Sequence, residues 1–469
     1  MLCSLGLFLL RGLWLDDLIV KDAKSQTGTS QLLTSQLITV KTVNVSFGGG
    51  RMSSFYFDKE KSFESFKQEL SMALSNIDRI TSISESEYFN TRLNKSIEYT
   101  LMMSLSQGEL LSILSSQELM KDQIKGEVRS ILLVAREMNK IWVITDAGFY
   151  EVYLKIAMVD PSNQIDNLEE DSSAVAFQTV SQRFGLPAYK VENGKELYNQ
   201  VLIPKFSLPM ILPVKVEPEI ALADVDALRN LARNVFGNRL DFVQEARDVN
   251  GSMVFLYGYG DKALRVSKEG IIEYSERFRD QLKDSIGLIE SLQSALSMLE
   301  KIGGPINEIY LNSIEQISKE GVSGYRFEFG YRIDNYSVIS IEGYNGASVE
   351  VYGGVVKSAY RNVYKYNSFK ALTNEQTSSL ETDDAQFFNM ISQKDNFTVI
   401  EKNYYRDLSV EEVPPQSIES GQAVLNSLQD VYVGFYYDKE DKMLPGVVLQ
   451  FGSQKYCIDF YTYNLINKE

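Results

Sequence analysis

The sequence predicts an α+β fold, made of three domains of antiparallel sheet with covering helices. Short segments in which apolar and polar residues alternate follow one another across glycine-containing turns, a pattern typical of hairpin-linked strands. Amphipathic segments with apolar residues three and four positions apart stand between these runs, which indicates helices. The 27 tyrosines and 24 phenylalanines among 469 residues are typical of antiparallel sheets with aromatic cross-strand pairs.

The first element is an apolar stretch, Leu2–Leu15, interrupted by Arg11. As a helix it would span about 21 Å, against about 30 Å for the hydrocarbon core of a bilayer. It also lacks the basic flank and the small-residue cleavage site of a secretory signal peptide. The stretch is thus too apolar for a free terminus and too short, as written, to cross a membrane.

An N-terminal α+β domain is expected at residues 21–205. Its first segment, Lys21–Gln31, is rich in Ser, Thr and Gln and is interpreted as a linker. Residues 40–57 then read VKTVNVSF, GGGR and SSFYF, which predicts a hairpin. A helix is predicted from near Ser62, because apolar residues follow it at steps of three and four.

Two further apolar stretches, Tyr99–Leu114 and Ile131–Tyr153, belong to the same domain. The acidic segment Asp160–Asp171 follows them. Its acidic and polar residues faintly resemble a calcium loop, but Ile165 stands where such a loop needs glycine. We therefore expect a solvated surface loop there.

A domain boundary is predicted at Ile203–Glu219, which holds four of the ten prolines and should be an extended connector. A central α+β domain, residues 219–368, is expected beyond it. Its first helix is expected over Leu222–Val235 and its second over Leu282–Leu299, each followed by hairpin-linked strands. The second helix should end at Gly303, where Gly-Gly-Pro follows the apolar pattern.

A C-terminal α+β domain is expected at residues 369–469. Its helix, predicted near Ile418–Leu428, again leads into a run of antiparallel strands. A helix followed by a meander thus recurs along the last part of the chain. We interpret the last two units as a weak internal repeat.

Composition excludes several classes of function. The net charge of −16 argues against a nucleic-acid partner, because phosphate binding requires clustered Lys and Arg. The chain contains no histidine, which removes Ser-His-Asp and Cys-His catalysis and histidine zinc sites. It cannot be a kinase that phosphorylates its own histidine. Its two cysteines form neither a disulfide framework nor a metal cluster.

No motif predicts a catalytic centre, a cofactor or a metal. The glycines at Gly48–Gly50 and Gly258–Gly260 lie between predicted strands and open no helix, so turns are expected instead of phosphate or dinucleotide sites. The carboxylate pairs Asp383–Asp384 and Glu411–Glu412 have no basic or nucleophilic neighbour in the sequence. Cys457 lies in a predicted strand and is expected to be a buried thiol. We expect a protein that is not an enzyme.

Several stretches carry a resemblance to a known family. They are LGLFLLRGLWL, VSFGGGRMSSFYFDKEKSFESFKQEL, KALRVSKEGIIEYSE, LEKIGGPINEIYLNSIEQ with the strands up to Arg361, and GQAVLNSLQDVYVGFYYDKEDKMLPGVVLQF. Together they resemble the YycH family, membrane-anchored regulators of the essential cell-wall two-component system of Gram-positive bacteria. The last stretch is also similar to the sister regulator YycI. The motifs are diffuse strand and turn patterns that cover most of the chain.

The resemblance implies that residues 1–20 are the outer part of a truncated transmembrane anchor, with Trp14 at the outer interface. It implies a single-pass protein of the cell membrane, with the bulk of the chain extracytoplasmic. Its partners would be the membrane, a sensor histidine kinase and a YycI-like regulator, and it would adjust kinase signalling. The residues expected on the anchor face are Leu7, Phe8, Leu9, Leu10, Leu13 and Trp14.

Two alternatives stay open. The chain could be a secreted or soluble binding module whose apolar stretch is a buried first helix. It could also be a hydrolase that uses carboxylates alone, such as a glycosidase, which needs two acids facing each other across a cleft and no histidine.

Overall fold

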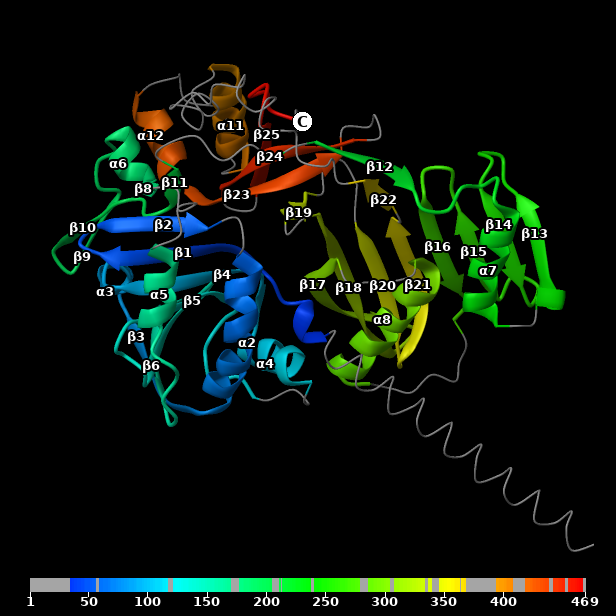
Figure 1. Cartoon of the computed structure of the whole chain (residues 1–469), viewed down its shortest axis with the longest axis horizontal. Helices are drawn as coiled ribbons and strands as arrows, with labels where there is room; N and C mark the ends of the chain where they lie inside the picture. The colour runs from blue at the N-terminus through cyan, green and yellow to red at the C-terminus, as the bar shows by residue number, and fades with distance from the viewer. Residues whose placement is uncertain are drawn as a thin grey trace, which may run out of the picture.

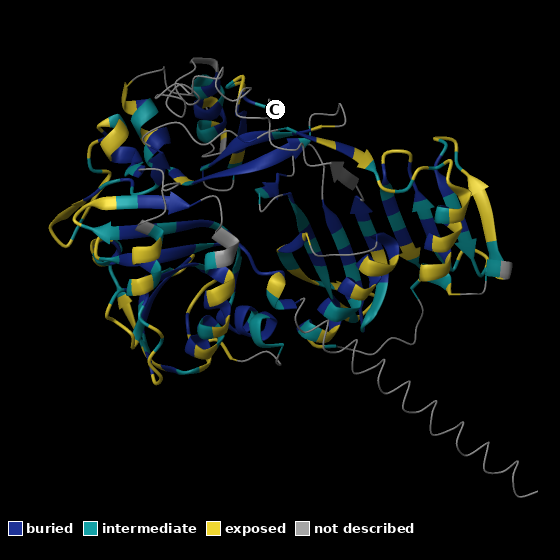
Figure 2. Ribbon diagram, viewed as in Figure 1, coloured by how far each residue is buried: buried dark blue, intermediate teal, exposed yellow. Residues whose placement is uncertain are grey.

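The structure is a computed structural model of antiparallel sheets with covering helices, which confirms the predicted α+β class (Figure 1). It describes residues 34–466 except 56–58, 117–120, 170–176, 205–210, 212, 238–239, 279–285, 304–307, 334–335, 340–345, 363, 368–393, 408–417, 438–441 and 452–453. The strands are largely buried, while exposed residues gather on the outer sides of helices and on turns (Figure 2).

The N-terminal unit is a seven-stranded antiparallel sheet in the order β2-β1-β4-β5-β6-β7-β3. Its strands are β1 (Val40–Gly48), β2 (Arg51–Phe55), β3 (Ile77–Ile83), β4 (Ser96–Leu105), β5 (Val128–Val134), β6 (Lys140–Thr145) and β7 (Gly148–Leu154). The β1–β2 pair is the hairpin predicted from the sequence, with Val43 opposite Phe55. Gly48, Gly49 and Gly50 all have positive φ angles, a conformation that glycine adopts without steric cost, so this segment is a turn.

Helices cover the two faces of this sheet unequally. On one face lie α2 (Lys59–Ser75), α4 (Gln107–Ser115) and α5 (Ser162–Glu169). Their buried side chains, among them Phe63, Leu70 and Leu110, join the apolar side chains of β1 and β4 in one core. The other face carries the short α3 (Glu85–Arg92), whose Tyr88 packs with Leu132 and Trp142.

The acidic segment at residues 160–171 corrects one expectation, because α5 occupies Ser162–Glu169 where a surface loop was predicted. The Asp160 carboxylate accepts hydrogen bonds from the backbone N–H and the hydroxyl of Ser162, which satisfies the start of the helix. Ile165 is fully buried and Leu168 packs against the same core. The three-residue spacing of these two apolar side chains places them on one helical face.

The central unit is a second antiparallel sheet, in the order β13-β14-β15-β16-β21-β20-β18-β17. Its strands are β13 (Val243–Arg247), β14 (Met253–Tyr257), β15 (Lys262–Val266), β16 (Ile271–Glu276), β17 (Ile309–Lys319), β18 (Val322–Ile333), β20 (Ala347–Tyr352) and β21 (Val355–Asn362). The covering helices are α7 (Val225–Phe236) and α8 (Leu288–Gly303), with a short 3₁₀ turn, η1 (Leu240–Phe242), after α7. Helix α8 ends at Gly303 as predicted, but begins later than the predicted Leu282.

The C-terminal unit continues the central sheet. Its strands are β12 (Val214–Pro218), β19 (Tyr336–Val338), β22 (Tyr364–Asn367), β23 (Leu428–Tyr437), β24 (Lys442–Phe451) and β25 (Gln454–Asp459). Strand β19 pairs in parallel with β23, which joins the two sheets into fourteen strands across the described part of the chain. The unit also contains α11 (Lys394–Asp407) and the predicted helix α12 (Ile418–Asn426).

The segment between the N-terminal and central units differs from the predicted limits. It forms β8 (Phe177–Thr179), α6 (Val180–Phe184), β9 (Lys190–Glu192), β10 (Lys195–Leu197) and β11 (Leu202–Pro204). Phe177, Val180 and Ile203 are buried in the core of the C-terminal unit, although the predicted N-terminal domain extends to residue 205. The proline-rich connector also contributes β12, which pairs with both β22 and β24. Contacts with strands much later in the chain decide this placement.

The parallel junction between β19 and β23 yields a stability prediction. A Cβ atom at Gly434 would lie 2.5 Å from the backbone oxygen of Ser337 and 2.9 Å from Ile339. We expect Gly434→Ala to destabilise the protein by about 1–3 kcal/mol, because backbone must move to accommodate the methyl group. Urea unfolding followed by circular dichroism measures the change.

Gly287→Ala is the matched control, because nothing lies within 4 Å of its Cβ position. It should change stability by less than about 0.5 kcal/mol. Equal effects of the two substitutions would contradict the close approach at Gly434.

Candidate functional site

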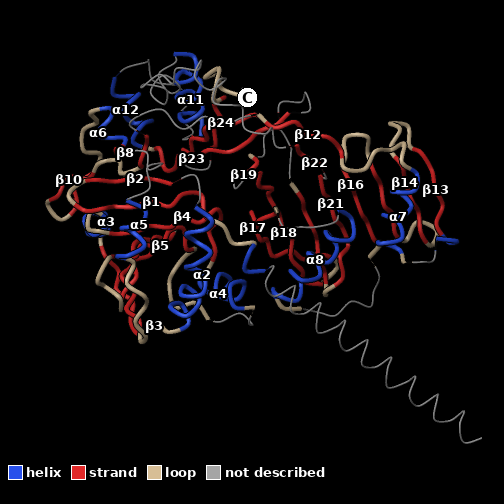
Figure 3. The backbone as a smooth tube through the Cα atoms, in the orientation of Figure 1, coloured by secondary structure: helices blue, strands red, loops and turns tan. Residues whose placement is uncertain are grey.

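A cavity of about 650 Å³ lies between the N-terminal sheet and the C-terminal unit. Its floor is the face of β1, β2, β4 and β5 that α2, α4 and α5 leave uncovered. Its roof comes from Asn426–Val431 and from side chains of β24 and β25, and its sides from α3, Tyr189, residues 199–202 and Tyr404. In Figure 1 strand β23 lies beside β2, with β8 and β11 next to them, and Figure 3 shows β23, β2 and β8 in the same arrangement.

The floor of the cavity is polar. Thr42 and Asn44 of β1, Ser54 of β2, Glu98 and Thr100 of β4 and Ser130 of β5 all line it. Their neighbours Val43, Val45, Ile97 and Tyr99 point into the core on the opposite face. Side chains alternate between the two faces of a strand, so the sheet has one apolar and one polar face. Here the polar face is covered by protein.

An ion pair between Arg92 and Glu98 is the main charged feature of the floor. The two residues are 7% and 3% exposed, and Arg92 Nε lies 3.2 Å from Glu98 Oε2. Tyr88 donates its hydroxyl to Glu98 Oε1 at 2.7 Å, and Asn44 Nδ2 donates to Glu98 Oε2 at 3.0 Å. A buried carboxylate costs several kcal/mol unless it is paired in this way.

Helix α3 positions two members of this cluster. It begins with a capping box, in which the Ser84 hydroxyl accepts from the Glu87 N–H and the Glu87 side chain accepts from the Ser84 N–H. Tyr88 and Arg92 stand four residues apart and so share one face of the helix. Arg92 is also in the last turn, where a cation is favoured by the helix dipole.

The side chains of Lys41 and Asn199 hold the roof over the floor. Lys41 Nζ on β1 lies 3.0 Å from Asp430 Oδ2 on β23 and donates to Gln450 Oε1 at 3.3 Å. Asn199 Nδ2 donates to the backbone oxygens of Leu425, Asn426 and Leu428 at 2.9–3.1 Å. It thereby satisfies carbonyl groups at the end of α12.

The carboxylates of the cavity are engaged by cations. Glu98 pairs with Arg92, Asp430 with Lys41, and Glu85 with Lys190 at 3.3 Å. Tyr189 also donates its hydroxyl to Glu85. Burial raises the pKa of Tyr189, and the neighbouring Glu85 carboxylate raises it further. Among the described residues, no group of Cys, Asp and Glu side chains could hold a metal ion. This arrangement is suited to binding a polar molecule.

The residues singled out from the sequence do not meet at this cavity. The expected anchor residues Leu7, Phe8, Leu9, Leu10, Leu13 and Trp14 lie outside the described residues. The pairs Asp383–Asp384 and Glu411–Glu412 lie outside them as well. Cys457 is buried in β25 as predicted, and burial raises the pKa of its thiol.

The cavity residues were not identified from the sequence. Alternation along β1 and β4 predicts one polar face, which in antiparallel sheets ordinarily meets water. A local signal did exist, namely the start of a helix at Ser84–Glu87 shortly before Glu98. The cover, however, comes from residues 426–431, 451, 454 and 456, far along the chain, and no local pattern indicates it.

Comparison with known proteins adds no assignment. No protein-family model matches the sequence, and neither a curated protein nor a solved structure matches it. Within the described ranges, none of the helices combines the length and apolar character needed to span a bilayer.

The buried ion pair yields a prediction for Glu98→Ala. Removing the carboxylate leaves Arg92 buried without its counter-charge, so we expect a loss of about 3–5 kcal/mol of unfolding free energy. The exposed Glu137→Ala, which removes a 3.7 Å pair with Lys140, should cost less than about 1 kcal/mol. Urea unfolding of the two variants checks the difference.

Removing both charges tests the cause. Arg92→Met combined with Glu98→Leu should recover part of the stability lost in Glu98→Ala, because no lone charge remains buried. If Glu98→Ala were as mild as Glu137→Ala, the pair would not be a buried one in solution.

Tyr88 yields a prediction for alkaline pH. Burial first, and then the charge of Glu98, raise the pKa of Tyr88 well above its usual value. Above pH of about 10 the unfolded chain loses this proton while the folded protein keeps it, so stability falls as pH rises. Tyr88→Phe should reduce that slope by up to about 1.4 kcal/mol per pH unit.

Thermal unfolding between about pH 9 and 11 measures the slope. Tyr259→Phe is the control, because the Tyr259 side chain is fully exposed and should leave the slope as in the wild type. Equal slopes for Tyr88→Phe and the wild type would contradict the prediction.

Proposed function

We propose that the protein is a non-catalytic, extracytoplasmic regulator held at the cell membrane by a single anchor. It associates with a sensor histidine kinase and a YycI-like regulator and modulates two-component signalling in cell-wall homeostasis. The resemblance to the YycH family motivates the proposal. One observation in the structure supports it, namely how the segment after the expected anchor is attached.

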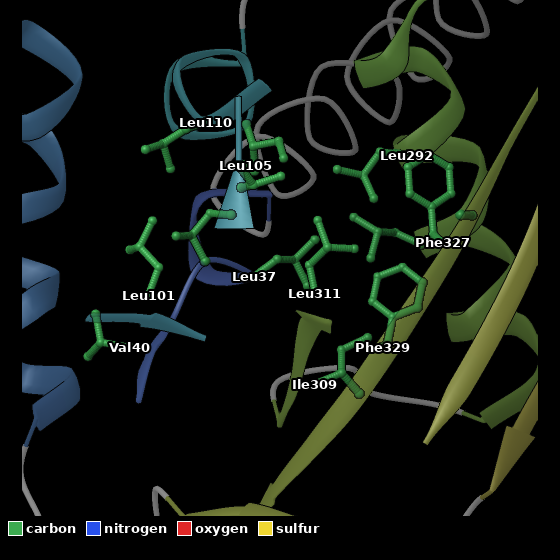
Figure 4. Packing of buried hydrophobic residues seen from close by; sticks show 14 of the residues in the cluster. Leu37, Val40, Leu101, Leu105, Leu110, Leu292, Ile309, Leu311, Phe327 and Phe329 are labelled. Atoms are coloured by element: carbon green, nitrogen blue, oxygen red, sulfur yellow. The ribbon is translucent and has the colours of Figure 1, made fainter. Parts of the chain in front are cut away.

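This segment is fixed where the N-terminal and central units meet. Leu37 is 1% exposed and lies in the core between Leu105 and Leu110 of the N-terminal unit and Leu311 of β17 (Figure 4). The Leu311 N–H donates to the Leu37 carbonyl at 2.9 Å. A short helical turn at residues 34–36 precedes Leu37, and Thr34 Oγ1 lies 2.9 Å from Ser116 Oγ.

Such an attachment couples a membrane segment to the folded units. Burial of one leucine side chain contributes about 1.5–3 kcal/mol to the free energy of unfolding. Because this is several times the thermal energy, residues 34–38 move together with both units. A rotation or shift of the anchor would therefore be transmitted to them. Lateral packing of transmembrane helices against those of a kinase would provide the contact through which signalling is adjusted.

The cavity supports the non-catalytic part of the proposal. Glu98 and Asp430 both line it, as a carboxylate hydrolase would need, but each is held in an ion pair with Arg92 or Lys41. Glu98 further accepts hydrogen bonds from Tyr88 and Asn44. A carboxylate engaged in this way is poorly placed to donate a proton or attack a substrate.

The cavity also favours a second candidate, a secreted or soluble binding module. A roofed polar hollow between two units is a common location for a small-molecule site. Membrane attachment and an effect on kinase output distinguish the regulator from this candidate.

The anchor is tested in cells that express the gene from its natural locus with a C-terminal epitope tag. We expect the protein in the membrane fraction, with its folded units open to protease added outside the cell. Leu9→Lys with Leu13→Lys should release it, because each lysine costs about 2.5–3.5 kcal/mol of membrane insertion energy. The output of the kinase, read with a reporter promoter, should change in the same cells.

Gln26→Lys with Thr29→Lys is the matched control, since it adds the same charge in the polar segment beyond the anchor. It should leave localisation and kinase output unchanged. A wild-type protein found in the soluble fraction, or a kinase output that is unchanged by the anchor substitutions, would favour the binding module instead.

A further inference from the structure

We propose that the cavity between the N-terminal sheet and the C-terminal unit binds a small organic carboxylate that also carries amide groups and an apolar part. This inference goes beyond the regulatory role and does not depend on a kinase. Four observations carry it, concerning charge, strand geometry, unpartnered polar atoms and the shape of the cavity.

The charges of the lining select an anion. Six charged side chains line the cavity: Lys41, Arg92, Arg129, Glu85, Glu98 and Asp430. The three carboxylates are all engaged in ion pairs, with Arg92, Lys41 and Lys190. Within the described part of the chain, Arg129 has no hydrogen-bond or ion-pair partner. A ligand carboxylate would supply one, and the planar guanidinium can bind both carboxylate oxygens.

A β-bulge brings Arg129 to this face. Val128 pairs with Thr145 and Ser130 with Ile144, so β5 has one more residue than β6 at this point. Arg129 is the extra residue. An extra residue bends its strand and redirects its side chain, and such bulges are frequent beside binding sites. Arg129 and Ser130 consequently both line the cavity, although they are neighbours in one strand.

Two buried polar atoms of the lining have no hydrogen-bond partner among the described residues. They are Ser54 Oγ on the floor and Asn426 Oδ1 in the roof. Ser54 is 5% exposed. An unmade hydrogen bond at a buried group is destabilising, and a ligand with donors and acceptors would supply it.

The size and shape of the cavity fit a molecule of this kind. Its volume of about 650 Å³ is within the usual range for small-molecule sites. Aromatic side chains from several elements line it beside the polar groups: Phe89, Phe149, Tyr189, Tyr404, Phe451 and Tyr456. A second hollow shares Tyr189, Tyr404, Asn426 and Ser427 with it and is bordered by the exposed Glu419. This hollow therefore adjoins the cavity.

A ligand here would contact both units. Ser54 and Arg129 belong to the N-terminal sheet, whereas Asn426 precedes β23 of the C-terminal unit. The bound molecule would thus add to the contacts made by Lys41 and Asn199 and would stabilise the roofed arrangement.

The test uses the purified chain and two matched sets of probes. One set contains the N-acetyl derivatives of the protein amino acids, and the other contains the same compounds as carboxamides, which lack the charge. At about 10 mM, we expect at least one acid to raise the melting temperature by about 2 °C or more, with no such shift from its amide. Isothermal titration calorimetry then gives the Kd.

Variants of the lining separate specific from incidental binding. Arg129→Gln should raise the Kd about tenfold or more, and Arg129→Lys should raise it less, because the charge is kept. Arg136→Gln is the control: this arginine follows the same strand but is exposed and does not line the cavity. Circular dichroism and melting without ligand verify that each variant is folded.

Either of two results would overturn the proposal. The first is that no acid of the set stabilises the wild-type protein. The second is that acids stabilise wild type and Arg129→Gln equally, which would indicate binding elsewhere. Since no membrane or kinase is present, a negative result here leaves the regulatory proposal untouched, and the reverse also holds.

Discussion

The buried carboxylate of Glu98 is the constraint on which the interior between the N-terminal sheet and the C-terminal unit depends. A charge at that depth is tolerated only with several partners, and Arg92, Tyr88 and Asn44 provide them from α3 and β1. The cluster, together with the packing of Tyr88 against Leu132 and Trp142, in turn fixes α3 against this face of the sheet. The cavity can remain polar and roofed because the Glu98 carboxylate, whose burial is the most costly, already has hydrogen-bond and ion-pair partners.

The beginning of β1 is where the three units come together. The Leu37 carbonyl accepts a hydrogen bond from β17 of the central unit. Lys41 forms an ion pair with Asp430 of β23 and donates a hydrogen bond to Gln450 of β24 in the C-terminal unit. Between them, the Met102 N–H donates to the Thr39 carbonyl within the N-terminal unit. Five consecutive residues thus contact all three units. Any force applied to the chain before residue 37 would reach every unit by way of this short segment.

The fold class and many elements could be predicted from the sequence because their signals are local. The β1–β2 hairpin follows from alternation around three glycines, and the end of α8 follows from Gly303. The same local reasoning missed α5, because the acidic residues around Ile165 and Leu168 concealed a pair of core positions. It also missed the cavity, because the cover over Glu98 and Ser54 comes from residues that only the tertiary fold brings near.

The placement of β12 has a consequence for how the chain folds. Its partners, β22 and β24, are synthesised long after it, so β12 stays unpaired until residues 364–367 are available and gains its second partner only with residues 442–443. Pairings of such high contact order form slowly, and open strand edges invite aggregation in the meantime. The four prolines around this strand limit its ability to pair with other chains during that interval. The prolines of this segment thus protect the incomplete nascent chain from aggregation.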